Sequence, residues 1–114
     1  MSQARKKSNI VFAVEVDENS VPERIEWNAE AEKQGGPCKA IMLSLWDEKE
    51  RNTLRIDLWT KEMTIDEMKQ FFHQTLLTMT DTYERSTGDR KLAEDMRDFC
   101  AYFGVQTGLI KENG

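Results

Sequence analysis

The sequence predicts an α+β fold with the order ββββαα, in which a four-stranded antiparallel sheet is followed by two amphipathic helices packed on one of its faces. Two observations support this prediction. Up to residue 60, apolar and polar residues alternate at the period of a β-strand, and beyond residue 64 apolar residues recur every three or four positions. Strands that precede helices in this way are typical of an antiparallel sheet covered by helices.

The length of the chain, 114 residues, suits one domain and is too short for two independent cores. We expect residues 1–8 to form a disordered basic tail and residues 9–104 to form a single α+β domain. Residues 105–114 form a C-terminal tail whose degree of order the sequence leaves open.

The first two strands are expected over residues 9–17 and 22–28. Residues 9–17 are rich in β-branched and apolar types, and the polar residues that follow are turn formers. Pro22 opens the second strand, at the position where a strand tolerates proline best. Residues 29–37, which end in Gly-Gly-Pro, are expected to be a polar loop.

The last two strands are expected over residues 38–47 and 53–60, joined by a short polar hairpin connection. Each has one clearly apolar face, since side chains two apart point the same way. The residues expected to pack beneath the helices are Ile41, Leu43, Leu45, Leu54, Ile56 and Leu58.

Two helices follow. The segment from Thr64 to Glu67 has the form of a capping box, which marks a helix start. Gly88 lies in the break between the helices, and Gly104 is expected to cap the second helix at its C-terminus. The apolar stripes on the two helices are Met68, Phe72, Leu76, Met79 and Tyr83, then Leu92, Met96, Phe99 and Phe103.

Charge and composition argue against several ligands. The chain carries 16 Lys and Arg against 21 Asp and Glu, a net charge of −5. An acidic body repels phosphate, so nucleic acid is not expected as a partner. No apolar run approaches the length of a membrane span, and the run at residues 10–14 is too short for a signal peptide. We therefore expect a cytoplasmic protein that does not insert into a membrane.

No catalytic, cofactor or metal site is expected. His73 is the only histidine, and it has no metal-ligand partner one helical turn away. Cys38 and Cys100 are far apart in the sequence and are expected to be free thiols. Without a nucleophile and base in a recognisable pattern, the sequence predicts a protein that is not an enzyme and needs no cofactor.

Excess apolar surface is the feature that points to function. Strand 38–47 is apolar on both faces, and Met42 and Trp46 lie on its second face, where Trp59 of strand 53–60 joins them. Either the sheet curls and these residues are core, or they form an exposed patch for a protein partner or a homodimer. We take Met42, Trp46 and Trp59 as the candidate protein interface.

Several segments resemble the GldC family of gliding-motility-associated proteins of Bacteroidetes-type bacteria. They are LRIDLWTKEM at residues 54–63, DEMKQFF at 66–72 and PERIEW at 22–27. The resemblance implies a small cytoplasmic accessory protein of gliding motility, with components of the motility machinery as partners. It implies no enzymatic activity, cofactor or binding residue.

Two functional hypotheses follow. The first is a non-catalytic accessory protein of gliding motility that acts by binding other proteins. The alternative is a chaperone or holdase module that binds unfolded or secreted clients, because four antiparallel strands followed by two helices resemble the export chaperone SecB. That alternative rests on fold analogy alone.

Overall fold

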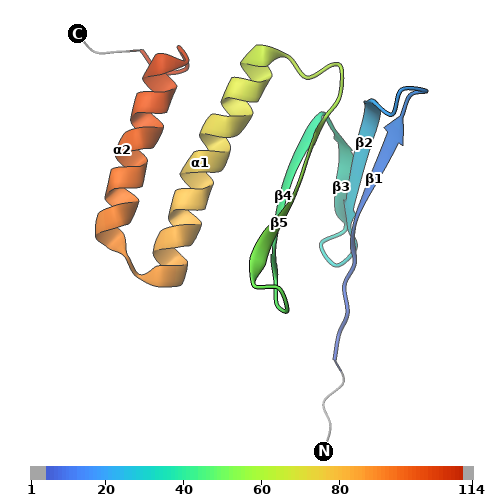
Figure 1. Cartoon of the computed structure of the whole chain (residues 1–114), viewed down its shortest axis with the longest axis horizontal. Coiled ribbons are helices and arrows are strands. Elements are labelled where there is room, and N and C mark those ends of the chain that lie inside the picture. Colours follow the sequence, from blue (N-terminus) through green and yellow to red (C-terminus); the bar gives the residue numbers. More distant parts are fainter. Residues whose placement is uncertain (1–4, 112–114) are drawn as a thin grey trace, which may run out of the picture. The chain divides into compact units, whose positions relative to one another are not determined.

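The computed structural model describes residues 5–111 of the chain and divides it into two compact units (Figure 1). The sheet unit spans Met1–Met63 and the helical unit spans Thr64–Gly114. The outermost parts of the two expected tails, residues 1–4 and 112–114, lie outside the described residues. The α+β class is confirmed, with all strands in the first unit and both helices in the second.

The sheet unit contains two small antiparallel sheets. One has the strand order β1-β2-β3, and the other pairs β4 with β5. The prediction of one four-stranded sheet is therefore wrong. The five strands are β1 (Ile10–Val16), β2 (Pro22–Ala29), β3 (Gln34–Cys38), β4 (Ala40–Asp47) and β5 (Asn52–Trp59).

The sequence prediction missed β3, which takes up residues 34–37 of the expected loop 29–37 and the first residue, Cys38, of the expected strand 38–47. Glycine and proline disfavour strands, so the Gly-Gly-Pro segment looks like a turn. Tertiary context overrides this preference at Gly35, where a Cβ atom would lie 2.5 Å from the carbonyl oxygen of Trp27. Glycine allows β3 to pass this close to the backbone of β2.

The expected strand 38–47 is interrupted at Lys39, the single residue between β3 and β4. β3 pairs with β2, whereas β4 pairs with β5. The carbonyl oxygen of Lys39 accepts a hydrogen bond from the backbone N–H of Thr60 at 2.8 Å. The strand therefore changes its partner at Lys39, which explains why two sheets replace the single predicted one.

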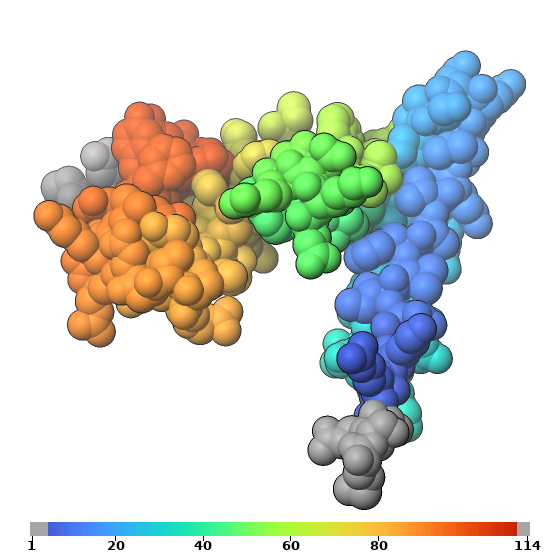
Figure 2. Space-filling model, turned by 60° about the horizontal axis from the view of Figure 1, so that its bottom comes forward, coloured from blue at the N-terminus to red at the C-terminus, as the bar shows by residue number. Residues whose placement is uncertain are grey.

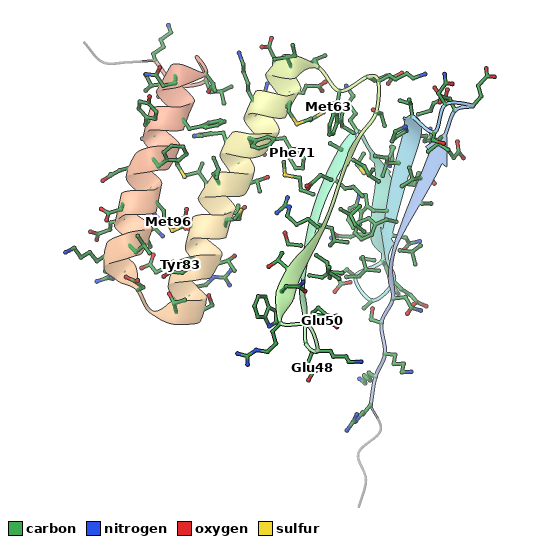
Figure 3. All side chains as sticks on the ribbon, viewed as in Figure 1. Glu48, Glu50, Met63, Phe71, Tyr83 and Met96 are labelled. Carbon is green, nitrogen blue, oxygen red and sulfur yellow. The ribbon has the colours of Figure 1, made fainter. Side chains whose placement is uncertain are left out.

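Side chains of aspartate organise two of the three hairpin turns of the sheet unit, β1–β2 and β4–β5. Asp17 Oδ1 accepts hydrogen bonds from the backbone N–H groups of Asn19 and Val21, at 2.8 and 3.0 Å. Asp47 Oδ2 accepts one from the N–H of Glu50 at 2.6 Å, and Glu50 lies at the tip of the β4–β5 hairpin (Figure 3). Both turns were expected from their polar sequences, since aspartate readily bonds the backbone a few residues ahead.

The helical unit is a hairpin of α1 (Ile65–Thr87) and α2 (Arg90–Gln106). The capping box is confirmed, because Thr64 Oγ1 accepts from the Glu67 N–H at 3.0 Å and the Glu67 carboxylate accepts from the Thr64 N–H at 3.1 Å. Gly88 ends α1 in the left-handed conformation with φ 75°. Asp89 then caps α2 by accepting from the N–H of Leu92.

Gly104 does not cap α2, contrary to the prediction. The helix continues to Gln106 and is capped by Thr107, and Gly104 is buried within it. A Cβ atom there would lie 2.4 Å from Ile110 Cδ1 and 3.1 Å from His73 Nε2. Its lack of a side chain serves close packing rather than a helix end.

The contact between the two helices uses small and hydrogen-bonding side chains. His73 Nε2 donates to the carbonyl of Cys100 at 3.1 Å, and Arg97 contacts Glu84 at 2.5 Å across the hairpin. The buried residues of the helices are Thr80, Ala93, Cys100 and Gly104. The predicted apolar stripes form this contact only in part: Phe103 stacks on His73 of α1, whereas Phe72, Met79, Leu92 and Phe99 are 42–52% exposed.

Candidate protein-interaction surface

The β4–β5 register places Met42, Trp46 and Trp59 on one face, as the alternation of the two strands predicts. Trp59 lies opposite Ala40, and Trp46 lies opposite Thr53. Trp46 is 67% exposed and Trp59 is 57% exposed, while Met42 is half-buried. Whether these residues form an interface is not tested by the structure and stays a prediction.

A polar cluster separates the two tryptophans on this face. Arg55 donates to Asp57 at 2.7 Å and to the hydroxyl of Ser44, also at 2.7 Å. Trp46 lies six residues along β4 from Ala40, the partner of Trp59, which corresponds to about 20 Å at strand spacing. The face is thus a row with an aromatic residue near each end and an ion pair between them.

The ion pair holds the charges of the cluster in place. The Arg55 guanidinium lowers the pKa of the Asp57 carboxyl, chiefly through their hydrogen bond. The same bond raises the pKa of Arg55. Both groups are exposed, so the pair contributes more to the shape and polarity of the surface than to stability.

The opposite face of β4 and β5 is apolar along its length, as predicted. Its cross-strand pairs are Ile41 with Leu58, Leu43 with Ile56, and Leu45 with Leu54. Packing of the helices on this face stays a prediction.

The strand β1, which the sequence predicts over residues 9–17, is the most open strand of the unit, and this exposure was not predicted. All seven of its residues are exposed, including Ile10 at 64%, Phe12 at 40% and Val14 at 36%. Residues of β1, drawn in blue, reach the surface along the strand in the space-filling view (Figure 2). The signal was present as an uncharged apolar run at residues 10–14, but the sequence does not show that this strand lies at a sheet edge.

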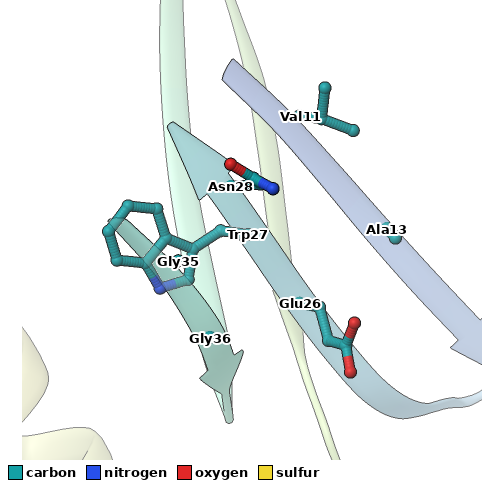
Figure 4. A pocket seen from close by; sticks show the side chains of 7 residues that line it. All are labelled: Val11, Ala13, Glu26, Trp27, Asn28, Gly35 and Gly36. Carbon is teal, nitrogen blue, oxygen red and sulfur yellow. The ribbon is translucent and has the colours of Figure 1, made fainter. Parts of the chain in front are cut away.

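A shallow hollow of about 250 Å³ lies over one face of the three-stranded sheet (Figure 4). Val11 and Ala13 come from β1, Glu26 and Asn28 from β2, and Gly35 from β3. The register places these five residues on one face, to which Gly35 contributes no side chain. Its one carboxylate, Glu26, already pairs with Arg24 at 2.6 Å. The lining therefore offers no pair of groups for acid–base or nucleophilic chemistry.

The titratable residues considered from sequence have structural roles. His73 stacks on Phe103, with 6.1 Å between ring centroids, and its Nε2 bonds a backbone carbonyl. Burial raises the pKa of the Cys38 thiol, which disfavours the reactive thiolate. Cys100 is buried beside Thr80, 3.9 Å from its hydroxyl. Within residues 5–111, no group of three or more side chains is placed to hold a metal ion.

Comparison with protein families identifies the chain. The model of the gliding motility-associated protein GldC-like family matches residues 22–109, well over half of the sequence. The chain belongs to the GldC-like family. The resemblance expected from residues 22–27, 54–63 and 66–72 is thereby confirmed, because all three segments lie within the match.

Membership in the GldC-like family associates the chain with gliding motility. No curated protein and no solved structure matches the chain. In the part of the chain that the structure describes, neither helix has the length and apolar character needed to cross a bilayer.

Proposed function

We propose that this GldC-like protein is a cytoplasmic accessory component of bacterial gliding motility that acts by binding other proteins of the motility machinery, without catalysis. Family membership supports the process. The observation that carries the binding mechanism is the exposure of Trp46 and Trp59 on one face of the β4–β5 sheet.

Exposed tryptophans favour a protein ligand for a physical reason. The free energy of the system falls when a partner buries a large aromatic side chain that was exposed to water. Tryptophan is among the residues that contribute most to binding at interfaces. The Arg55–Asp57 pair between them offers fixed donors and acceptors, and these select a partner with complementary polar groups. We therefore assign contact area to the two tryptophans and orientation to the ion pair.

The absence of catalysis is supported by the chemistry of the polar side chains. Glu26 and Asp57 are paired with arginines, and His73 is engaged in helix packing. A catalytic acid or base needs access to a substrate and a poised proton. Each of these three groups is already engaged with another group of the chain. No specific observation favours the alternative of a SecB-like holdase.

The test is a crosslinked affinity pull-down from the native cell, with retained proteins identified by mass spectrometry. Wild type is compared with Trp46→Glu and Trp59→Glu, each of which places a charge on the proposed interface. We expect motility components with the wild type, and their recovery reduced at least about tenfold by either variant, as expected for the loss of an interface tryptophan.

A matched control is Tyr102→Glu, which changes an aromatic residue of α2 that is 60% exposed, much as Trp59 is. This control should retain the partners. Far-ultraviolet circular dichroism must show that the tryptophan variants stay folded, because unfolding would mean that the tryptophans are core. Equal recovery by wild type and both tryptophan variants would contradict the proposal, and suppression of client aggregation at stoichiometric amounts would favour a holdase instead.

A further inference from the structure

We propose that the outer edge of β1 is a homodimerisation edge, at which β1 pairs antiparallel with β1 of a second copy and joins the two three-stranded sheets into one. This inference is independent of the tryptophan face, since it concerns another strand, another sheet and another partner. It rests on the direction of the backbone groups of β1, its side chains and its charge pattern.

The backbone of β1 has one unpaired side. Its only sheet neighbour among the described strands is β2. The N–H of Glu30 donates to the carbonyl of Asn9 at 3.1 Å, so Asn9 and every second residue after it face β2. Ile10, Phe12 and Val14 therefore turn their N–H and carbonyl groups outward. These groups form a ready template for another strand.

The side chains of β1 do nothing to block such a strand. Ile10–Val14 contains no charge, no proline and no glycine, and the one irregularity in its pairing with β2 lies later, between Glu15 and Val16. Proteins that stay monomeric protect an edge with lysine, proline or a bulge. This edge has none of these over its first five residues, so we expect it to be covered.

The apolar face of the sheet is buried on β2 but exposed on β1. Ile25 and Ala29, on β2, are buried at 0% and 7% exposure. Val14 and Ile10 are their cross-strand neighbours on β1, yet they are 36% and 64% exposed. A second β1 would supply new cross-strand neighbours for these side chains and continue the face.

The strand is complementary to itself in the antiparallel direction. If Phe12 lies on the two-fold axis, it meets its own copy, Ile10 meets Val14, and all three pair through outward backbone groups. About six hydrogen bonds then form between the strands. The ends match as well, because Lys6 and Lys7 precede the strand, whereas Glu15 lies near its C-terminal end and Glu18 follows it. Antiparallel pairing brings each basic end to an acidic end, and parallel pairing does not.

The decisive experiment is a charge swap at Phe12, measured by analytical ultracentrifugation of the purified full chain with no other protein present. We expect the apparent molecular mass of the wild type to rise from 13.3 kDa toward twice that value as its concentration rises. A single strand pair is a small interface, so half-dissociation is expected at roughly micromolar concentration. Phe12→Lys and Phe12→Glu each place like charges on the axis and should weaken the dimer at least about tenfold.

Mixing the two variants separates the proposal from simple misfolding. An equimolar mixture places lysine opposite glutamate, and we expect it to recover dimers that neither variant forms alone. The matched control is Leu77→Lys on α1. The side chain of Leu77 is 37% exposed, a fraction similar to the 40% of Phe12, and this variant should dimerise as wild type does. A wild type that stays monomeric would overturn the proposal. So would a dimer that both Phe12 variants leave intact.

Cysteine crosslinking reads the register directly. With Phe12 on the axis, Val11 of one copy lies opposite Ala13 of the other as a non-hydrogen-bonded pair, about 4.5 Å between Cα atoms and within disulfide reach. In a Cys38→Ser background, mixed Val11→Cys and Ala13→Cys chains should crosslink on oxidation. Self-crosslinking of Ala13→Cys or of Val11→Cys would instead move the axis to Ala13 or to Val11, and either would overturn the Phe12 register.

Discussion

The two outer strands of the three-stranded sheet, β1 and β3, present very different edges to their surroundings. β1 offers an uninterrupted apolar run with outward-facing donors and acceptors. β3 contains Gly35, Gly36 and Pro37, and it ends at Cys38, directly before Lys39, whose carbonyl accepts a hydrogen bond from Thr60. One edge of the sheet is thus open to another strand and the other is not.

Proline has a specific role in this difference. Because Glu30 faces β1, Trp27 and Ile25 face β3, and their partners Gly36 and Cys38 face back toward β2. Pro37, between them, is therefore turned outward, where its missing N–H costs β2 no hydrogen bond and deprives the outer edge of a donor. The comparison teaches that edge protection in this fold is set residue by residue, by which side of the strand each residue faces.

The largest effect is expected from Gly35→Val, a substitution in β3. The added Cβ would meet the Trp27 carbonyl oxygen at 2.5 Å, and a backbone atom cannot simply rotate away. We expect the free energy of unfolding, measured in urea, to fall by about 2–3 kcal/mol. Gln34→Ala, at the exposed neighbouring position, is the control and should cost much less. Equal losses in the two variants would mean that the close approach of β2 and β3 is unimportant.

Two single proline substitutions in β1 should distinguish effects on folding stability from effects on dimerisation. Ala13→Pro removes an N–H that faces β2 and should lower the free energy of unfolding by about 2 kcal/mol. Val14→Pro removes an outward N–H and should cost at most about 1 kcal/mol, yet still weaken the dimer. Urea denaturation and sedimentation, run on both variants, measure the two effects. If Val14→Pro were the less stable variant, the assignment of which backbone N–H groups of β1 face β2 would be wrong.

The smallest effect concerns pH and the turn at the end of β1. A hydrogen bond from Lys61, helped by backbone N–H groups, lowers the pKa of Asp17 from 3.8 to about 2. A carboxyl with a lowered pKa stabilises the fold above its unfolded pKa and loses that contribution as the pH falls through the folded value. The stability advantage of wild type over Asp17→Asn should therefore be constant above about pH 5 and shrink toward pH 2. A difference that does not change with pH would mean that the Asp17 charge contributes nothing.

Much of the local structure could be predicted from the sequence because it depends on residues close together in the chain. The Thr64–Glu67 capping box, the aspartate turns and the inward and outward faces of β4 and β5 all follow from spacing of four residues or fewer. The failures involve contacts between distant residues. β3 was missed because the reason for its glycine is the backbone of Trp27, and Gly104 was misassigned because its neighbours are His73 and Ile110.

The candidate site divides in the same way. Alternation alone placed Trp46 and Trp59 on one face, but the Arg55 contacts that separate them depend on the register of the hairpin. The apolar character of residues 10–14 was visible in the sequence. Their position at an edge was not, because strand order is a property of the whole sheet.

The order of the strands along the chain has a consequence for the timing of folding. Within each sheet, every paired strand is the next one in sequence, and the helices pair in the same way. Short separations between contacting residues make loop closure inexpensive in entropy and favour rapid folding. During synthesis, the β1–β2 hairpin is complete once residue 29 has emerged. The self-complementary edge would therefore be exposed on the growing chain before the strands that carry Trp46 and Trp59 have emerged.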